Sequence, residues 1–241
     1  MAKEKAIPLN QKAYSVIKKS IITMDLPPGS QIDESYLMRM FSIGRTPIRE
    51  ALFRLAAEEL VETAGNRGFF VTPITLEDVR SLFEAMLISI RSHAVLAARG
   101  VQKEHLERLY KAHQAHQEAI TKRDFFEITL LNSRFHRIIC EATNNRYLIY
   151  SFNHLQDQAQ RLSYLSYSKE IPPYDINENF KIVIETHASI ISLLEKKDAT
   201  GLLERLLEHS EQFRSRVLCY LNPSTETITK ERSSPPSLKD G

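Results

Sequence analysis

Apolar residues recur at helical spacing in three segments of the first 60 residues. The pattern predicts helices over residues 10–25, 33–40 and about 45–59, and Asp33 suits the N-cap of the second. The first helix is expected to end at Leu26-Pro27-Pro28-Gly29-Ser30, because proline and glycine in succession favour a turn. A very short strand at residues 31–32 is expected to follow that turn.

Two short apolar segments come next and favour strands instead. Residues 60–63 and 69–72 are the predicted strands, and Ala-Gly-Asn-Arg-Gly at residues 64–68 forms the hairpin tip between them. Helix, short helix, helix and two-stranded wing is the order of elements in a winged helix-turn-helix. Pro73 marks the end of this unit, so we predict a first domain over residues 1–74.

Every segment from Thr75 to about Leu221 has a helical period, and none favours a strand. Helices of this length form a bundle, so residues 75–221 are predicted to be a second, all-α domain. The fold class is therefore mainly α, a winged helix-turn-helix followed by a helical bundle. The six helices are expected at about 76–99, 102–122, 124–142, 145–167, 175–196 and 199–220. Breaks are expected at Gly100, Arg123-Asp124, Asn144-Asn145, Pro172-Pro173 and Lys197-Asp198.

Composition narrows the class of protein. Hydrophobic residues make up 42% and charged residues 26% of the 241, an ordinary globular balance. No apolar run approaches the roughly 20 residues of a membrane-spanning helix, and the N-terminus lacks the apolar core of a secretory signal. We therefore predict a cytoplasmic protein without a membrane partner. Residues 222–241 contain Ser-Ser-Pro-Pro-Ser and almost no apolar residues, which predicts a disordered tail.

Net charge alone does not indicate a nucleic-acid partner. The whole chain has a formal net charge of +2, and ten Lys/Arg against eight Asp/Glu in the first 74 residues again give +2. A claim of nucleic-acid binding must therefore depend on where a few arginines lie.

Arg45 and Arg49 are those arginines. They are four residues apart at the start of the third predicted helix and share one face, while Ile48, Leu52 and Leu55 share another, apolar face. An arginine can donate two parallel hydrogen bonds to guanine or neutralise a phosphate, and spacing does not distinguish the two. Arg67 at the hairpin tip has two interpretations, insertion into a minor groove or an exposed turn residue.

These segments resemble the DNA-binding domain of the GntR family of bacterial regulators. The resemblance covers residues 10–73. It implies a homodimer on a pseudo-palindromic DNA operator, with Gly44 standing where members commonly have Ser, Thr or Asn. The matching motifs are Leu26-Pro27-Pro28-Gly29, Arg45-Thr46-Pro47-Ile48-Arg49-Glu50-Ala51-Leu52 and Arg67-Gly68-Phe69-Phe70-Val71. The implied DNA contacts are Ser35, Arg45, Thr46, Arg49, Arg67 and Gly68.

Histidines of the second domain indicate a possible metal site. Asn132 and His136 are four apart on one predicted helix and face the same way, and His187 and His209 lie on two later helices. Imidazoles that meet in a bundle core can bind Zn²⁺ or Ni²⁺, or they can be buried and satisfied by hydrogen bonds. Spacing alone favours the second interpretation.

Residues 76–220 resemble the FCD ligand-binding domain of the same family. The matching stretches are Asn132-Ser133-Arg134-Phe135-His136, Ala142-Thr143-Asn144-Asn145, Thr186-His187-Ala188-Ser189-Ile190 and Glu208-His209. The resemblance implies a divalent metal, Zn or Ni, held by one Asp and three His. His136, His187 and His209 match, whereas Asn132 replaces the Asp. A neutral amide binds a cation more weakly than a carboxylate and leaves the site one charge more positive.

The same resemblance implies a small organic acid above the metal, held in part by arginine. Arg161 is the candidate effector-binding residue, and a surface salt bridge is the alternative. Met86 stands where many relatives have an arginine. The implied function is a ligand-responsive transcriptional regulator, in most relatives a repressor.

Two other function classes are consistent with parts of the sequence. A metal-dependent enzyme would need a general base beside the histidines, but Glu185 and Glu208 are their neighbours in sequence and point elsewhere on their helices. The chain is therefore predicted not to be an enzyme. A winged helix used only for protein contacts would not need Arg45 and Arg49, and it would show no salt-dependent DNA binding.

Overall fold

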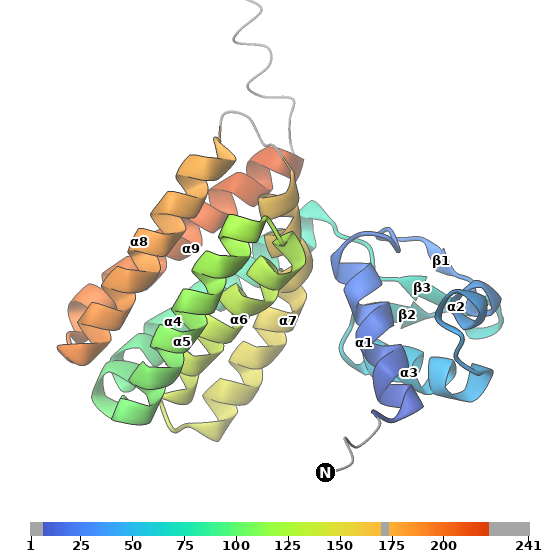
Figure 1. The fold of residues 1–241 in the computed structure, drawn as a ribbon, viewed down its shortest axis with the longest axis horizontal. Helices are drawn as coiled ribbons and strands as arrows, with labels where there is room; N and C mark the ends of the chain where they lie inside the picture. The colour runs from blue at the N-terminus through green and yellow to red at the C-terminus, as the bar shows by residue number, and fades with distance from the viewer. Residues whose placement is uncertain (1–6, 170–173, 222–241) are drawn as a thin grey trace, which may run out of the picture.

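The computed structural model describes residues 7–169 and 174–221. Within them it has a small N-terminal domain of three α-helices and one sheet, and a larger bundle formed by α4 to α9 (Figure 1). The mainly α fold class predicted from the sequence is confirmed. The tail at residues 222–241 and the break at Pro172-Pro173 lie outside the described residues.

The N-terminal domain has the predicted order of elements. A three-stranded antiparallel sheet has the order β1-β3-β2, so the last strand lies in the middle. The elements are α1 (Leu9–Ile22), β1 (Gln31–Ile32), α2 (Glu34–Phe41), α3 (Arg45–Ala57), β2 (Val61–Thr63), a short 3-10 helix η1 (Gly65–Arg67) and β3 (Phe69–Val71).

Local sequence explains where α2 and α3 begin. The Asp33 carboxylate accepts a hydrogen bond from the backbone N–H of Tyr36 at 3.0 Å, which caps α2 as predicted. Gly44 precedes α3 without a side-chain cap. Ile48, Leu52 and Leu55 are fully buried, so this face of α3 anchors the helix in the domain core and leaves Arg45 and Arg49 on another face.

The bundle consists of α4 (Leu76–Gly100), α5 (Lys103–Lys122), α6 (Phe125–Glu141), α7 (Arg146–Ser168), α8 (Ile176–Glu195) and α9 (Ala199–Leu221). Side-chain caps start four of these helices: Thr75, Asp124, Asn145 and Asp175 each accept a backbone N–H of the first turn. Arg123, Asn144 and Lys197 adopt left-handed backbone at three of the predicted breaks. Gly100 differs, because it remains helical. A Cβ there would overlap the carbonyl oxygen of Ala142.

Helix α4 is long and apolar enough to cross a membrane by length and composition alone, with a mean hydropathy of 1.3 over an 18-residue window. Charged residues interrupt it, so it contains no continuous apolar run of the length that a membrane span needs. Core helices of soluble proteins meet the same criterion, and Val79, Phe83 and Ile90 of α4 are buried in the bundle. Its other side leaves Ile88 at 68% and Leu96 at 38% exposure.

Candidate functional site

A surface groove in the N-terminal domain brings together most of the predicted DNA-contacting residues. Ser35, Arg45, Arg67 and Gly68 line it, although they come from α2, α3 and the wing. Thr46 is exposed beside Arg45, and Arg49 lies one turn further along α3. The predicted set therefore forms one surface, with Thr46 and Arg49 at its margin.

Both α3 arginines contact the same carboxylate. Glu34 at the start of α2 lies 3.1 Å from Arg49 Nη1 and 3.7 Å from Arg45 Nε. Arg49 also lies over the rings of Phe53 and Phe69, at 5.7 and 5.6 Å from their centroids. Arg45 is the more exposed of the two, with 69% of its side chain accessible against 41% for Arg49. Glu34 thus orients both arginines before any nucleic acid is bound, a contact that sequence spacing did not indicate.

The wing tip is fixed to the first strand. Gln31 Nε2 donates a hydrogen bond to the carbonyl oxygen of Arg67 at 2.8 Å. Gly65 and Gly68 have positive φ angles of 54° and 85°, a backbone that glycine adopts without strain. Arg67 is exposed and therefore projects from a braced turn.

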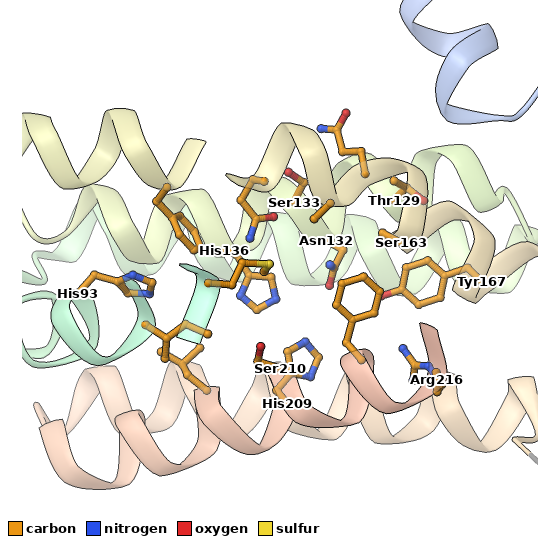
Figure 2. Close-up of a pocket in the computed structure, with 18 residues that line it drawn as sticks. His93, Thr129, Asn132, Ser133, His136, Ser163, Tyr167, His209, Ser210 and Arg216 are labelled. Carbon is orange, nitrogen blue, oxygen red and sulfur yellow. The ribbon is translucent and has the colours of Figure 1, made fainter. Parts of the chain in front are cut away.

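The bundle encloses a cavity between α4, α6, α7 and α9 (Figure 2). Its volume is about 40 Å³, room for roughly three water molecules. Asn132, His136 and His209 of the predicted metal set line it, and His187 lies behind them on α8. Among the remaining lining residues are His93, Ser133, Gln160, Ser163, Tyr167, Ser210, Phe213 and Arg216.

Three histidines from three helices converge at this cavity. His136, His187 and His209 each offer a ring nitrogen, and these atoms all lie within 4.8 Å of one another. The ring centroids are 5.1 to 5.5 Å apart. Phe135 stacks on His187 at 4.0 Å and fixes its orientation. The structure therefore brings these three histidines together, as the sequence predicted.

Buried polar atoms that lack a hydrogen-bond partner indicate whether these residues could bind a cation. The Oδ1 of Asn132, both ring nitrogens of His187 and the Nδ1 of His209 are buried without a hydrogen-bond partner among the described residues. Buried polar atoms normally have partners. Three imidazoles and one amide oxygen are a chemically suitable donor set for Zn²⁺ or Ni²⁺. The residues fit a divalent cation.

The histidines are held in the neutral form that binds metals. Burial, and then His209, His93 and His116, lower the pKa of His136 well below its ordinary value. Burial likewise lowers the pKa of His187, and burial followed by the charge of Arg216 lowers that of His209 to about 3. Neutral imidazoles offer lone pairs at neutral pH without first losing a proton.

Other histidines lie near the site that sequence matching did not assign to it. His116 is fully buried with its ring 5.2 Å from that of His187, and His113 is 6.1 Å from the same ring. His93 lines the cavity and packs on Phe152 at 4.6 Å. The sequence signal for a buried His116 was its helical spacing of four and three residues from Ala112 and Ala119, all of which the structure buries on α5.

Arg161 lies outside the cavity. It donates a hydrogen bond to the carbonyl oxygen of Thr72, and it lines a separate pocket between the two domains. Its neighbour Gln160 faces the cavity instead, because consecutive residues of a helix point about 100° apart. The arginine that lines the cavity is Arg216 of α9, which the sequence reasoning missed. This places the predicted effector residue at a domain contact.

Helix α7 contacts the cavity on one face and the N-terminal domain on another. One face lines the cavity through Gln156, Gln160, Ser163 and Tyr167. The other holds the N-terminal domain, which lies beside α7 in Figure 1. Its contacts are Gln158 Nε2 to the carbonyl oxygen of Glu58, Arg161 to Thr72, His154 to Glu59 at 3.4 Å, and Asp157 to Lys18 at 2.8 Å.

A chain of polar contacts connects the cavity to α1. Ser133 lines the cavity and accepts a hydrogen bond from Arg137 Nε at 3.2 Å. Arg137 Nη2 lies 3.2 Å from Asp157, and Asp157 pairs with Lys18. Lys18 also pairs with Glu58 at 2.9 Å. Burial lowers the pKa of Lys18, but its hydrogen bonds to Asp157, Tyr14 and Glu58 outweigh burial and raise it overall, so Lys18 is firmly charged.

Two family models match the chain. One is described as "Bacterial regulatory proteins, gntR family" and matches residues 9–71, and the other is described as "FCD domain" and matches residues 76–212. The matches correspond to the two domains of the structure. Their boundary falls at residues 72–75, between β3 and α4.

Relatives of known name span nearly the whole chain. The HTH-type transcriptional repressor RspR of Escherichia coli strain K12 is 24% identical over 230 residues, 93% of this chain and 95% of that protein. The gluconate operon transcriptional repressor of Bacillus licheniformis is 23% identical over 201 residues, 83% and 82% of the two chains. The solved structure of E. coli McbR/YncC superposes with a TM-score of 0.74 at 20% identity and covers 90% of this chain and 100% of that one, which supports the fold.

Proposed function

Since the chain belongs to the gntR family of bacterial regulatory proteins and carries an FCD domain, we propose that it is a cytoplasmic, dimeric repressor whose affinity for its operator is set by a small organic acid. Transcriptional regulation itself follows from the family. The organic acid, the dimer and the cytoplasmic location are the parts that experiment must test. The observation that carries the proposal is that α7 contacts the cavity on one face and the DNA-binding domain on the other.

The N-terminal domain reads DNA through the start of α3 and the wing. Arg45 and Arg49 enter a major groove, where a guanidinium can bind guanine or a phosphate. Ser35 and Thr46 contact the backbone on either side, and Arg67 with Gly68 reaches the neighbouring minor groove. The shared groove of Ser35, Arg45, Arg67 and Gly68 supports this division of roles.

The second domain holds a divalent cation through His136, His187, His209 and the Asn132 side-chain oxygen. A bound cation supplies a positive centre to which a carboxylate can coordinate. The three imidazoles orient that centre from α6, α8 and α9. Since Asn132 is neutral, the positive charge of the cation is less compensated than with an aspartate.

Ligand binding must rearrange the bundle. A cavity of about 40 Å³ holds only a few waters, so an organic acid enters by displacing the side chains and helices that line it. Movement of α7 is transmitted to Lys18 and Glu58 through Asp157 and Gln158. A ligand that favours the widened bundle thereby shifts the placement of the DNA-binding domain, and with it operator affinity.

The dimer forms through the apolar surface that the bundle leaves uncovered. Ile88 and Leu96 of α4 and Tyr147 and Tyr150 of α7 are large and exposed. Contact between two copies along α4 would bury Ile88 and Leu96 and would place two recognition helices on one operator. Ile88→Glu is expected to shift the protein from dimer to monomer in sedimentation velocity, whereas Lys103→Glu on the exposed start of α5 leaves the mass unchanged.

The central test is a titration of operator binding. The full chain is mixed with fluorescent promoter DNA, and its affinity is measured by anisotropy at several salt concentrations and with a panel of small carboxylic acids. The proposal requires salt-dependent binding that at least one acid changes. Binding that no acid alters contradicts ligand control, and the absence of salt-dependent DNA binding contradicts the regulator itself.

A further inference from the structure

No acidic side chain is found among the described residues that line the bundle cavity. Of the 18 described residues that line it, none is Asp or Glu, and one, Arg216, carries a full positive charge. The histidines on its wall are neutral, and Asn132 adds no negative charge. The electrostatic balance of the cavity is therefore positive even before a cation is added.

Arg216 is a buried guanidinium for which the described part of the chain provides no anionic partner. Its exposure is 7%, its Nε has no hydrogen-bond partner, and its Nη2 contacts only Ser166 Oγ at 3.5 Å. Among residues 7–169 and 174–221, no carboxylate lies within ion-pair distance of it. Burial lowers its pKa, opposed in part by Tyr167 and Tyr174, yet a guanidinium stays protonated at neutral pH. A buried charge of this kind is costly unless an anion joins it.

The position of Arg216 relative to the histidines suggests the shape of that anion. His209 and Arg216 are seven residues apart on α9, two turns and about 10 Å along the axis, and both face the cavity. Figure 2 shows Arg216 and Tyr167 together at one end, with His136 and His209 nearer the middle. One small molecule can therefore reach both sites with groups at its two ends.

Arg216 also reaches the surface beside the cavity. It is the one described residue that lines both the cavity and an adjoining surface groove, which contains Asp175, Glu178 and Glu211. Glu211 is paired with Arg214 at 2.7 Å, so it does not neutralise Arg216. Arg216 is therefore the residue at which the cavity borders this groove.

We propose that Arg216 anchors a second anionic group, and that the cavity takes a small organic dianion, a diacid that joins Arg216 at one end to the His136, His187 and His209 cluster at the other. The inference rests on the proposed function, because it names the chemical class of that effector. Tyr167 offers a hydroxyl group to the anion beside Arg216, whereas the hydroxyl of Ser210 lies beside His209 (Figure 2). A monocarboxylate satisfies only one of the two ends.

The test compares acids that differ in one charge. Binding of succinate against butyrate, and of glutarate against pentanoate, is measured by calorimetry on the full chain, both chelator-treated and with Zn²⁺ added. Each diacid is expected to bind about tenfold or more tightly than its monoacid, the effect of one charge-assisted contact. Arg216→Gln is expected to remove this preference, and Arg216→Lys to retain part of it. Arg205→Gln, on the exposed side of α9, leaves the preference unchanged.

The outcomes separate this inference from the proposed function. Equal affinity for diacids and monoacids in the unmodified protein overturns the dianion, and so does a preference that survives Arg216→Gln. Either result leaves the proposed regulation by a different acid intact. The comparison on the unmodified protein decides the question even where Arg216→Gln does not fold. Loss of salt-dependent DNA binding would overturn the regulator, while the calorimetric preference would still stand.

Discussion

At the scale of single residues, Asn132 sets the charge of the cavity. It lies four residues before His136, and its Oδ1 is buried without a partner. An amide in this place can coordinate a cation but cannot neutralise it, which leaves the positive charge for an incoming anion. Arg45, Arg49 and Glu34 show the opposite arrangement in the other domain, where two cations share one carboxylate.

Replacing Arg49 tests the reading of DNA. Arg49→Ala is expected to weaken operator binding by about 1–3 kcal/mol, roughly fivefold to 150-fold, because a bidentate contact to a base contributes about that much free energy. Anisotropy titrations with operator and scrambled DNA measure the loss and its sequence dependence. Lys103→Ala, far from the N-terminal domain on α5, serves as the matched control. An unchanged operator affinity for Arg49→Ala would remove this arginine from the interface.

Replacing Asn132 tests the metal centre. Asn132→Asp adds a negative ligand of nearly the same size, so Zn²⁺ affinity is expected to rise by about tenfold or more, as added ligand charge commonly does. Competition with a chromogenic chelator measures the affinity directly. His136→Ala is the opposite control and should lower it. If Asn132→Asp left the affinity unchanged, the side chain of residue 132 would not be a ligand.

At the scale of elements, sequence periodicity predicted where the helices begin and end, but it did not predict how the helices contact one another. The bounds of all six bundle helices lie within one residue of the predicted ones, because caps and left-handed residues mark their ends. The first helix ends three residues early, at Ile22, where Met24 turns left-handed with φ 65°. Periodicity also placed the three histidines on separate helices, but it could not say which face of α7 meets which partner. Arg161 was therefore assigned to the cavity, and Arg216 was overlooked.

A substitution in α7 should separate the binding of an acid from the change in operator affinity that the acid causes. Asp157→Asn breaks the contact of α7 with Lys18 and Arg137, so the cavity and α1 lose their polar connection. Coupling between two sites is commonly about 1–3 kcal/mol, and the variant is expected to lose most of it. The measurement is operator affinity with and without a bound acid, expressed as a ratio.

The Asp157 experiment has its own control. Glu107→Gln removes an exposed carboxylate on α5 and should leave the ratio intact. Zn²⁺ affinity is expected to be the same in all three proteins, since neither position contacts the histidines. A full response in Asp157→Asn would place the coupling in the remaining contacts of α7, Gln158 with Glu58 and Arg161 with Thr72.

At the scale of the whole molecule, the bundle buries several histidines in neutral form. Burial lowers the pKa of His93 and His116 to about 4, and burial with Arg216 lowers that of His209 to about 3. His136 and His187 are shifted in the same direction. In the unfolded chain these groups titrate near pH 6.5, so the unfolded state binds more protons below that pH.

Stability should therefore fall as the pH drops below about 6.5. Each neutral histidine contributes a slope of about 1.4 kcal/mol per pH unit until its folded pKa is reached. Urea unfolding of chelator-treated protein at pH 7.5, 6.5 and 5.5 measures the free energy directly. His116→Gln removes one of these groups, so the change in unfolding free energy per pH unit is expected to fall by the contribution of one histidine, up to about 1.4 kcal/mol. A free energy of unfolding that stays constant from pH 7.5 to 5.5 would show that these histidines are not buried as described.

The carboxylate of Glu34 has a further consequence for how the protein finds its operator. A regulator must sample about 10⁶–10⁹ competing sites in a genome, and the time spent on each wrong sequence limits the search. Arg45 and Arg49 are already paired with Glu34, so each must leave this carboxylate before it can bind a DNA phosphate. The negative charge of Glu34 also repels the phosphate backbone of DNA. Only a sequence that satisfies both arginines compensates for this exchange. On the proposed interface we therefore expect short residence on other DNA and a faster search, which stopped-flow dissociation from non-operator DNA, compared between the unmodified protein and Glu34→Gln, would measure.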